Sequence, residues 1–177
     1  MHLYSFPAIE LVFSVLEILD EMKVGGTIYT TKNSLRTPSN FMKLYRELQV
    51  LNVNACNVYS PLALPATQWL FSIWIIFCIY GCIKFSGPFA FIMFVGAINV
   101  IVALVGILSL MAEVDVRSKQ LLRSWNGHSK SDLLKHFIRS SQSIRLYIGT
   151  FYYIDHGMVL TMLKFISECT VNLIILY

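Results

Sequence analysis

The sequence predicts an all-α integral membrane protein with three transmembrane helices, long cytosolic helical extensions and an amphipathic amino-terminal helix. Of the 177 residues, 56% are hydrophobic and only 14% are charged, whereas about a quarter of the residues of soluble domains are charged. Residues 48–83 and 85–112 contain no Asp, Glu, Lys or Arg. Because a helix needs roughly 20 residues to cross a bilayer, both stretches are long enough to span it. This composition argues against a disordered chain, a disulfide scaffold and a nucleic-acid-binding protein.

The basic residues indicate which ends of the apolar stretches face the cytoplasm. Twelve of the fourteen Lys and Arg residues lie in two blocks, within residues 23–46 and 117–145. Lys84 stands alone in the short connection between the apolar stretches. Cytoplasmic loops carry an excess of Lys and Arg. We therefore expect a multi-pass membrane protein with both blocks in the cytoplasm and residues 84–88 outside.

The first 39 residues are expected to form an amphipathic helix and a polar cytosolic connection. Apolar residues recur with a helical period over residues 7–22, and Gly25 and Gly26 follow this pattern directly. Glycine disfavours helix interiors, so these two residues are expected to end the helix. The connection that follows is rich in Ser and Thr and contains Pro38.

A second helix, within residues 40–66, is predicted to start in the cytoplasm and to enter the membrane. Its first half carries charged side chains and its second half is largely apolar. Ser39 or Asn40 is expected to cap its first turn. Pro61 and Pro65 are expected to bend it near the membrane boundary.

Three apolar runs are assigned as membrane spans. Span A comprises residues 67–83, span B residues 89–111 and span C residues 157–177. A Ser-Gly-Pro sequence at residues 86–88 is typical of a tight reversal between spans A and B. Spans A and B therefore form a hairpin, and span C runs outward from the cytoplasm.

Residues 113–153 form a basic region that favours helices and is interrupted at Asn126-Gly127. Leu134, Phe137 and Ile138 make an apolar stripe within it. Such a basic amphipathic helix lies on the inner leaflet, binds a calmodulin-like partner, or packs as a cytosolic anchor against neighbouring subunits. The sequence leaves these three roles open.

Span C is the most polar of the three spans. It contains Lys164, Glu168 and Asn172 in addition to hydroxyl side chains, and charges at mid-membrane usually face a partner or water. Lys164 and Glu168 are four residues apart and are able to pair. One interpretation is a self-neutralising pair buried against spans A and B. The other is a helix with one face on an aqueous path, narrowed by an aliphatic side chain such as Ile174.

No catalytic, cofactor or metal site is indicated by the sequence, and we do not expect an enzyme. The four histidines are scattered, and the acidic residues show no metal-binding spacing. Cys78 and Cys82 lie in an apolar run without a neighbouring His or acid, which favours a packing role. His156 beside Asp155 is interpreted as part of a helix cap or interface anchor.

Two stretches of the chain resemble the carboxy-terminal portion of the insect gustatory and odorant receptor superfamily. Residues 45–80, beginning YRELQVLNVNAC, resemble the helix that enters the fifth transmembrane segment of these receptors. Residues 133–177, ending ISECTVNLIILY, resemble their closing region, in which a cytosolic helix and an aromatic/Ile-Asp junction precede the final segment. Thr170 matches the signature Thr of that segment, while Val171 stands in the place of the usual Tyr.

The resemblance implies a ligand-gated cation channel in the membrane, with span C lining the pore of a homo- or hetero-tetramer of receptor subunits. Spans A, B and C would then be the fifth, sixth and seventh segments. Ile174 would fall at the aliphatic gate, with Tyr177 at the polar position beside it and Thr170 at the signature Thr. The cytosolic helices would form the tetramer anchor, and the ligand would be a small chemical.

Two alternatives remain at this point. One is a small non-channel membrane adaptor whose basic helix, within residues 117–145, recruits a protein partner or anionic lipid. The other is an inactive, truncated receptor. In both alternatives, as in the receptor interpretation, the chain is expected to contact membrane lipids and not to bind nucleic acid.

Overall fold

The computed structural model describes residues 2–25, 29–59, 61–128, 131–148 and 152–176. Within these ranges the chain is all-α except for one minimal hairpin, and the predicted fold class is confirmed. Its helices are α1 (His2–Met22), η1 (Asn33–Arg36), α2 (Pro38–Tyr59), α3 (Ala63–Lys84), α4 (Pro88–His128), α5 (Asp132–Ser140) and α6 (His156–Leu176). The hairpin pairs β1 (Tyr147–Ile148) with β2 (Tyr152–Tyr153) in antiparallel register.

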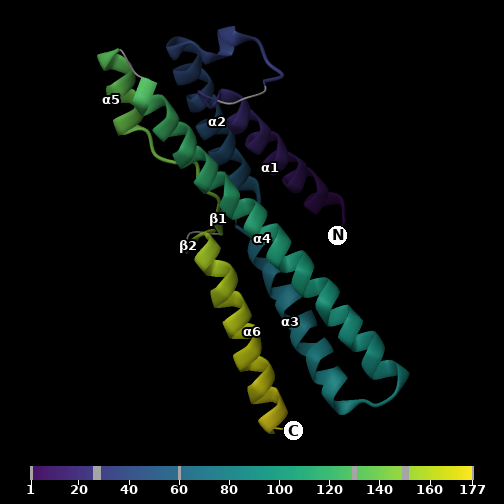
Figure 1. Cartoon of the computed structure of the whole chain (residues 1–177). Helices are drawn as coiled ribbons and strands as arrows, with labels where there is room; N and C mark the ends of the chain where they lie inside the picture. Colours follow the sequence, from purple (N-terminus) through teal and green to yellow (C-terminus); the bar gives the residue numbers. More distant parts are fainter. Residues whose placement is uncertain (1, 26–28, 60, 129–130, 149–151, 177) are drawn as a thin grey trace.

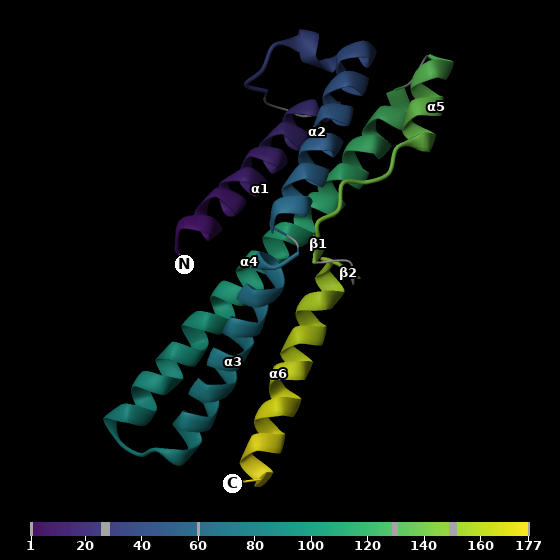
Figure 2. The same cartoon turned by 180° about the vertical axis from the view of Figure 1, so that it is seen from behind.

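Helices α3, α4 and α6 are long and apolar enough to cross a membrane, as the three predicted spans require. Helix α4 has 41 residues and runs along the whole molecule (Figure 1). Its amino-terminal half packs against α3, its carboxy-terminal half packs against α1 and α5, and Glu113 near its middle approaches His156 of α6. The α3–α4 turn and the carboxy-terminal end of α6 lie together at one end of the molecule, while α5 and the start of α2 lie at the other (Figures 1 and 2). Both basic blocks therefore gather at the end remote from Lys84.

The half of the molecule remote from the α3–α4 turn contains an aromatic core. Phe41 of α2 stacks on Trp125 of α4 with ring centroids 4.3 Å apart, and Phe137 of α5 meets Phe41 edge-on at 6.0 Å. Trp125 also donates its indole N–H to the carbonyl of Met22, which closes α1 onto α4. In contrast, large apolar side chains of α3 and α4 point outward along the membrane half, as expected of lipid-facing helices.

The start of α2 differs from the prediction. The helix begins at Pro38, so Ser39 and Asn40 lie inside its first turn and neither is its amino-terminal cap. Proline is favoured at the first helical position, because its missing N–H would have no partner there. Asn40 instead donates its side-chain amide to the carbonyl of Ser34 in η1.

The boundaries near the membrane also differ. Helix α3 begins at Ala63, four residues before the predicted start of span A, and accommodates Pro65 in its first turn, where backbone N–H groups have no partner in the helix. The described residues of the predicted helix 40–66 therefore divide between α2 and α3. Span B continues without a break into the predicted anchor region, residues 113–153, because α4 extends to His128.

The predicted anchor region, residues 113–153, is helical only in its first two thirds. After α5, the chain is extended from Ser141 and enters the β1–β2 hairpin. Ile144, Leu146 and Ile148 are buried, while the residues between them are less so. This two-residue alternation is the pattern of extended backbone that lies with one side against a core, which explains why the helical expectation fails here.

Candidate functional site

The face of α6 that points away from α3 and α4 is the candidate functional site. Helix α6 packs against those two helices and buries Met158, Ile166 and Thr170 there. The opposite face is exposed over its full length. It consists of residues spaced by three or four positions, namely Leu160, Lys164, Glu168, Val171 and Ile175, which fall in one stripe on a helix of 3.6 residues per turn.

The stripe has a charged pair at its centre. The Lys164 Nζ and Glu168 Oε1 atoms are 3.7 Å apart, and the two side chains are 76% and 61% exposed. Helix α6 has 21 residues, or about 30 Å at 1.5 Å per residue, which matches the hydrocarbon thickness of a bilayer. Lys164 and Glu168 are its ninth and thirteenth residues, so the pair lies near mid-membrane depth when α6 spans the bilayer.

The structure brings only some of the predicted site residues together. Asn172 is exposed on the flank of the Lys164–Glu168 stripe. Thr170 lies on the packed side, where it is buried and donates its hydroxyl to the carbonyl of Ile166 at 2.8 Å. Ile174 is half-buried and lies about 80° around the helix from Lys164. Tyr177 lies outside the described residues.

Sequence reasoning missed Val171 and Ile175. They lie one and two turns beyond Glu168 on the same stripe and are exposed, Ile175 strongly so. The signal was present in the sequence, because positions 164, 168, 171 and 175 follow the i, i+4, i+7, i+11 spacing of one helix face. The resemblance directed attention to Ile174 instead.

Contacts with neighbouring elements hold the amino-terminal end of α6. Asp155 caps the helix by accepting the backbone N–H of Met158 at 2.8 Å, in agreement with the predicted cap. The buried amide of Gln68 in α3 accepts the Tyr152 hydroxyl of β2 at 3.1 Å. His156 Nε2 lies 3.9 Å from a carboxylate oxygen of Glu113 in α4.

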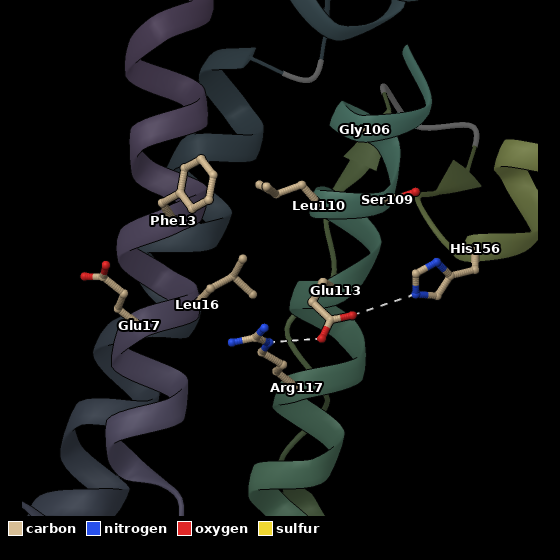
Figure 3. A pocket seen from close by; sticks show the side chains of 9 residues that line it. All are labelled: Phe13, Leu16, Glu17, Gly106, Ser109, Leu110, Glu113, Arg117 and His156. Carbon is tan, nitrogen blue, oxygen red and sulfur yellow. Dashed lines mark hydrogen bonds and ion pairs between the residues drawn. The ribbon is translucent and has the colours of Figure 1, made fainter. Parts of the chain in front are cut away.

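A groove between α1 and α4 opens beside this entry (Figure 3). Its volume is about 450 Å³. Phe13 and Leu16 of α1 and Leu110 of α4 form apolar walls, and Glu113 and Arg117 form a charged end.

A row of charges along this groove connects three helices. Arg117 pairs with Asp20 of α1 and, through Nε at 3.0 Å, with Glu113 of its own helix. Glu113 in turn approaches His156 at the start of α6. The sequence showed Arg117 only as a member of a basic block, because its partner Asp20 lies far along the chain.

Asp115 forms a second charged cluster between α4 and the extended segment after α5. Its buried carboxylate pairs with Lys119 one helical turn away and with Arg145 Nε at 3.3 Å. Burial lowers the pKa of Arg145, but the hydrogen bond and charge of Asp115 outweigh it and raise the pKa above the ordinary value. Next to this cluster, the Ser118 hydroxyl accepts the backbone N–H of Ile144 at 3.0 Å. These contacts fix the segment that leads toward α6.

Glu21 organises the connection between α1 and α2. Hydrogen bonds from the Thr31 hydroxyl, at 2.7 Å, and the Thr30 backbone N–H, at 2.9 Å, lower the pKa of Glu21 to about 2. Arg36 also pairs with its carboxylate at 3.4 Å. A carboxylate that accepts several hydrogen bonds is stabilised in its charged form.

The apolar stripe of α5 packs inside the chain. Leu134 and Phe137 are buried and Ile138 is partly buried. Phe137 meets Tyr45 of α2 edge-on at 6.2 Å. Burial raises the pKa of Tyr45, whose hydroxyl donates to the carbonyl of Gln142. The three predicted anchor residues thus join α5 to its own chain's core.

The fold and the α6 face define a class, a helical multi-pass membrane protein with a charged pair on the exposed face of α6. Comparison with protein-family models finds no match, and comparison with curated proteins finds no significant match either.

Proposed function

We propose that this chain is a subunit of a ligand-gated cation channel of the gustatory or odorant receptor type. In this proposal it supplies the elements that correspond to the fifth, sixth and seventh membrane segments of such a receptor. Helix α6 lines the conduction path, and the cytosolic bundle of α1, α2, α5 and the end of α4 holds it in place. The plasma membrane is the proposed location.

The observation that carries the proposal is the exposed Lys164–Glu168 pair. A charged side chain at the centre of a membrane helix costs about 3 kcal/mol on insertion scales. If α6 faced lipid, both charges would lie in hydrocarbon with only each other as partner. A water-filled path between copies of the chain would instead hydrate both charges.

The exposed residues around the pair support the same arrangement. Asn172 and Thr161 add an amide and a hydroxyl on one flank of the stripe. Val171 and Ile175 provide an apolar zone beyond it, and hydrophobic constrictions can gate channels by excluding water. The order of the helices also resembles that of the gustatory and odorant receptors, whose last helix lines a central pore.

The adaptor alternative receives less support. An amphipathic helix that recruits a partner or a lipid surface needs a free apolar face. The apolar stripe of α5, with Leu134 and Phe137, is already buried against α2 and α4. Its basic side chains Lys135 and Arg139 are exposed, but Leu133 is the one large apolar side chain of α5 that is exposed beside them.

The proposal is tested by subunit number and resting leak. We expect the purified full chain to form an oligomer in detergent, with four copies as the resemblance implies. In planar bilayers, Val171→Ala or Ile175→Ala should raise the leak current above that of the native chain, because each removes apolar bulk from the apolar zone on the exposed stripe. Ile73→Ala on the outer face of α3 serves as control. A strictly monomeric chain with no current in any variant would contradict the proposal.

A further inference from the structure

The Lys164–Glu168 pair brings together both signs of charge on the path proposed above. Within residues 157–176 these are the only Asp, Glu, Lys or Arg residues, and spans A and B contain none. The formal charge that an ion meets at mid-membrane depth is therefore set by this pair. A bare lysine at this position would repel cations and attract anions.

We propose that Glu168 is a specificity-determining residue that keeps the path open to cations by neutralising Lys164. The inference rests on the proposed function and names the residue that decides which ions pass. The two charged groups are 3.7 Å apart and belong to the same helix, so each copy of the chain neutralises its own lysine. Charge selection then depends on the balance within one α6 helix and not on how neighbouring copies are aligned.

The geometry predicts where each charge acts along the path. Leu160 lies one turn before Lys164, and Val171 lies one turn after Glu168, both on the exposed stripe. A probe at Leu160 therefore senses Lys164 more strongly, and a probe at Val171 senses Glu168 more strongly. Unit charges about 6 Å apart in water change the local concentration of a charged probe by roughly threefold.

The test uses the full chain in membrane vesicles, with Cys56, Cys78, Cys82 and Cys169 replaced by serine. Single cysteines are introduced as Leu160→Cys or Val171→Cys. Each is treated with a trimethylammonium methanethiosulfonate and, separately, with a sulfonate methanethiosulfonate. The measured quantity is the ratio of the cationic to the anionic labelling rate, which needs no ligand and no open gate.

Glu168→Gln is expected to lower this ratio about tenfold at Val171→Cys, because the two reagents respond in opposite directions. Lys164→Gln is expected to raise the ratio by a similar factor at Leu160→Cys. Each variant should change the ratio less at the cysteine that lies farther from the substituted charge. The combined Lys164→Gln and Glu168→Gln variant should give a ratio at each cysteine that lies between those of the native and the exchanged pairs. The exchanged pair, Lys164→Glu with Glu168→Lys, keeps net neutrality and should reverse the local preference at each cysteine.

The possible failures are distinguishable. Fast labelling with ratios that do not respond to either charge would overturn the role of Glu168 and leave the aqueous path intact. No labelling of either cysteine in any variant, including the charge-preserving exchange, would overturn the aqueous path and the inference with it.

Discussion

At the scale of single residues, Glu21 shows how a few hydrogen bonds fix a connection that has little apolar content. Its carboxylate accepts from the Thr31 hydroxyl and from two backbone N–H groups. Because the pKa of Glu21 falls from 4.5 to about 2 on folding, the folded state favours the charged form. The resulting stabilisation is fully present above pH 4.5 and is lost as the pH falls from 4.5 toward 2.

Thr31→Val should therefore raise the pKa of Glu21 toward its ordinary value, because the largest single cause of the depression is removed. The measurement is an NMR titration of the Glu21 carboxyl carbon. Thr37→Val is the matched control, since Thr37 lies in the same connection but bonds to Ser34. A native Glu21 that titrates near 4.5 would show that these bonds do not form.

Residue patterns predicted some of the site and not the rest. The pairing of Lys164 and Glu168 follows from their spacing within one helix. The pairing of Asp115 with Arg145 does not, because 30 positions and the whole of α5 separate them. Burial of Asp115 was equally hidden, because it lies among charged neighbours beyond the end of an apolar run.

At the scale of elements, the bundle of α2, α4 and α5 depends on aromatic packing. Phe41 is fully buried between Trp125 and Phe137. Phe41→Ala should destabilise the bundle by about 3–5 kcal/mol, the usual cost of deleting a buried phenyl ring. Val50→Ala on the exposed side of the same helix should change the stability by less than about 0.5 kcal/mol.

Unfolding of the purified chain in detergent, followed by near-ultraviolet circular dichroism, measures this difference. The stacked Trp125 ring makes the signal sensitive to the bundle. Equal stability of the Phe41→Ala and Val50→Ala variants would contradict the packing described for α2, α4 and α5.

Helix existence was easier to predict than helix boundaries. The apolar runs defined three spans, because a helix of soluble proteins rarely sustains the apolar length that a bilayer crossing requires. The sequence did not indicate that α4 continues to His128, because a polar helix can follow an apolar one without a break. The strand-like segment from Ile144 to Ile148 was hidden for a related reason. Its alternation is short, and the surrounding basic residues favour helices.

At the scale of the whole molecule, the two halves bury their side chains differently. The half that contains α5 closes around an aromatic core, whereas the membrane half leaves one face of each span exposed. On α3 and α4 these exposed faces are apolar and suited to lipid, except for Asn99 of α4, whose side-chain amide donates to the carbonyl of Val95. On α6 the exposed face carries two charges. We therefore expect lipid to cover the exposed faces of α3 and α4, and water to reach the exposed face of α6.

Cysteine accessibility in the native membrane tests this claim most directly. In the cysteine-free background, Val171→Cys and Ile175→Cys probe α6, and Ile73→Cys and Phe77→Cys probe α3. The native side chains have comparable exposure in the chain by itself, at 52% and 77% on α6 and at 58% and 60% on α3. Thiols in hydrocarbon stay protonated and unreactive toward water-soluble reagents.

We predict fast labelling of both α6 cysteines by a membrane-impermeant methanethiosulfonate and slow labelling of both α3 cysteines. If the α6 cysteines were labelled as slowly as the α3 cysteines, the α6 stripe would lie against lipid or protein. That result would contradict an aqueous path along α6.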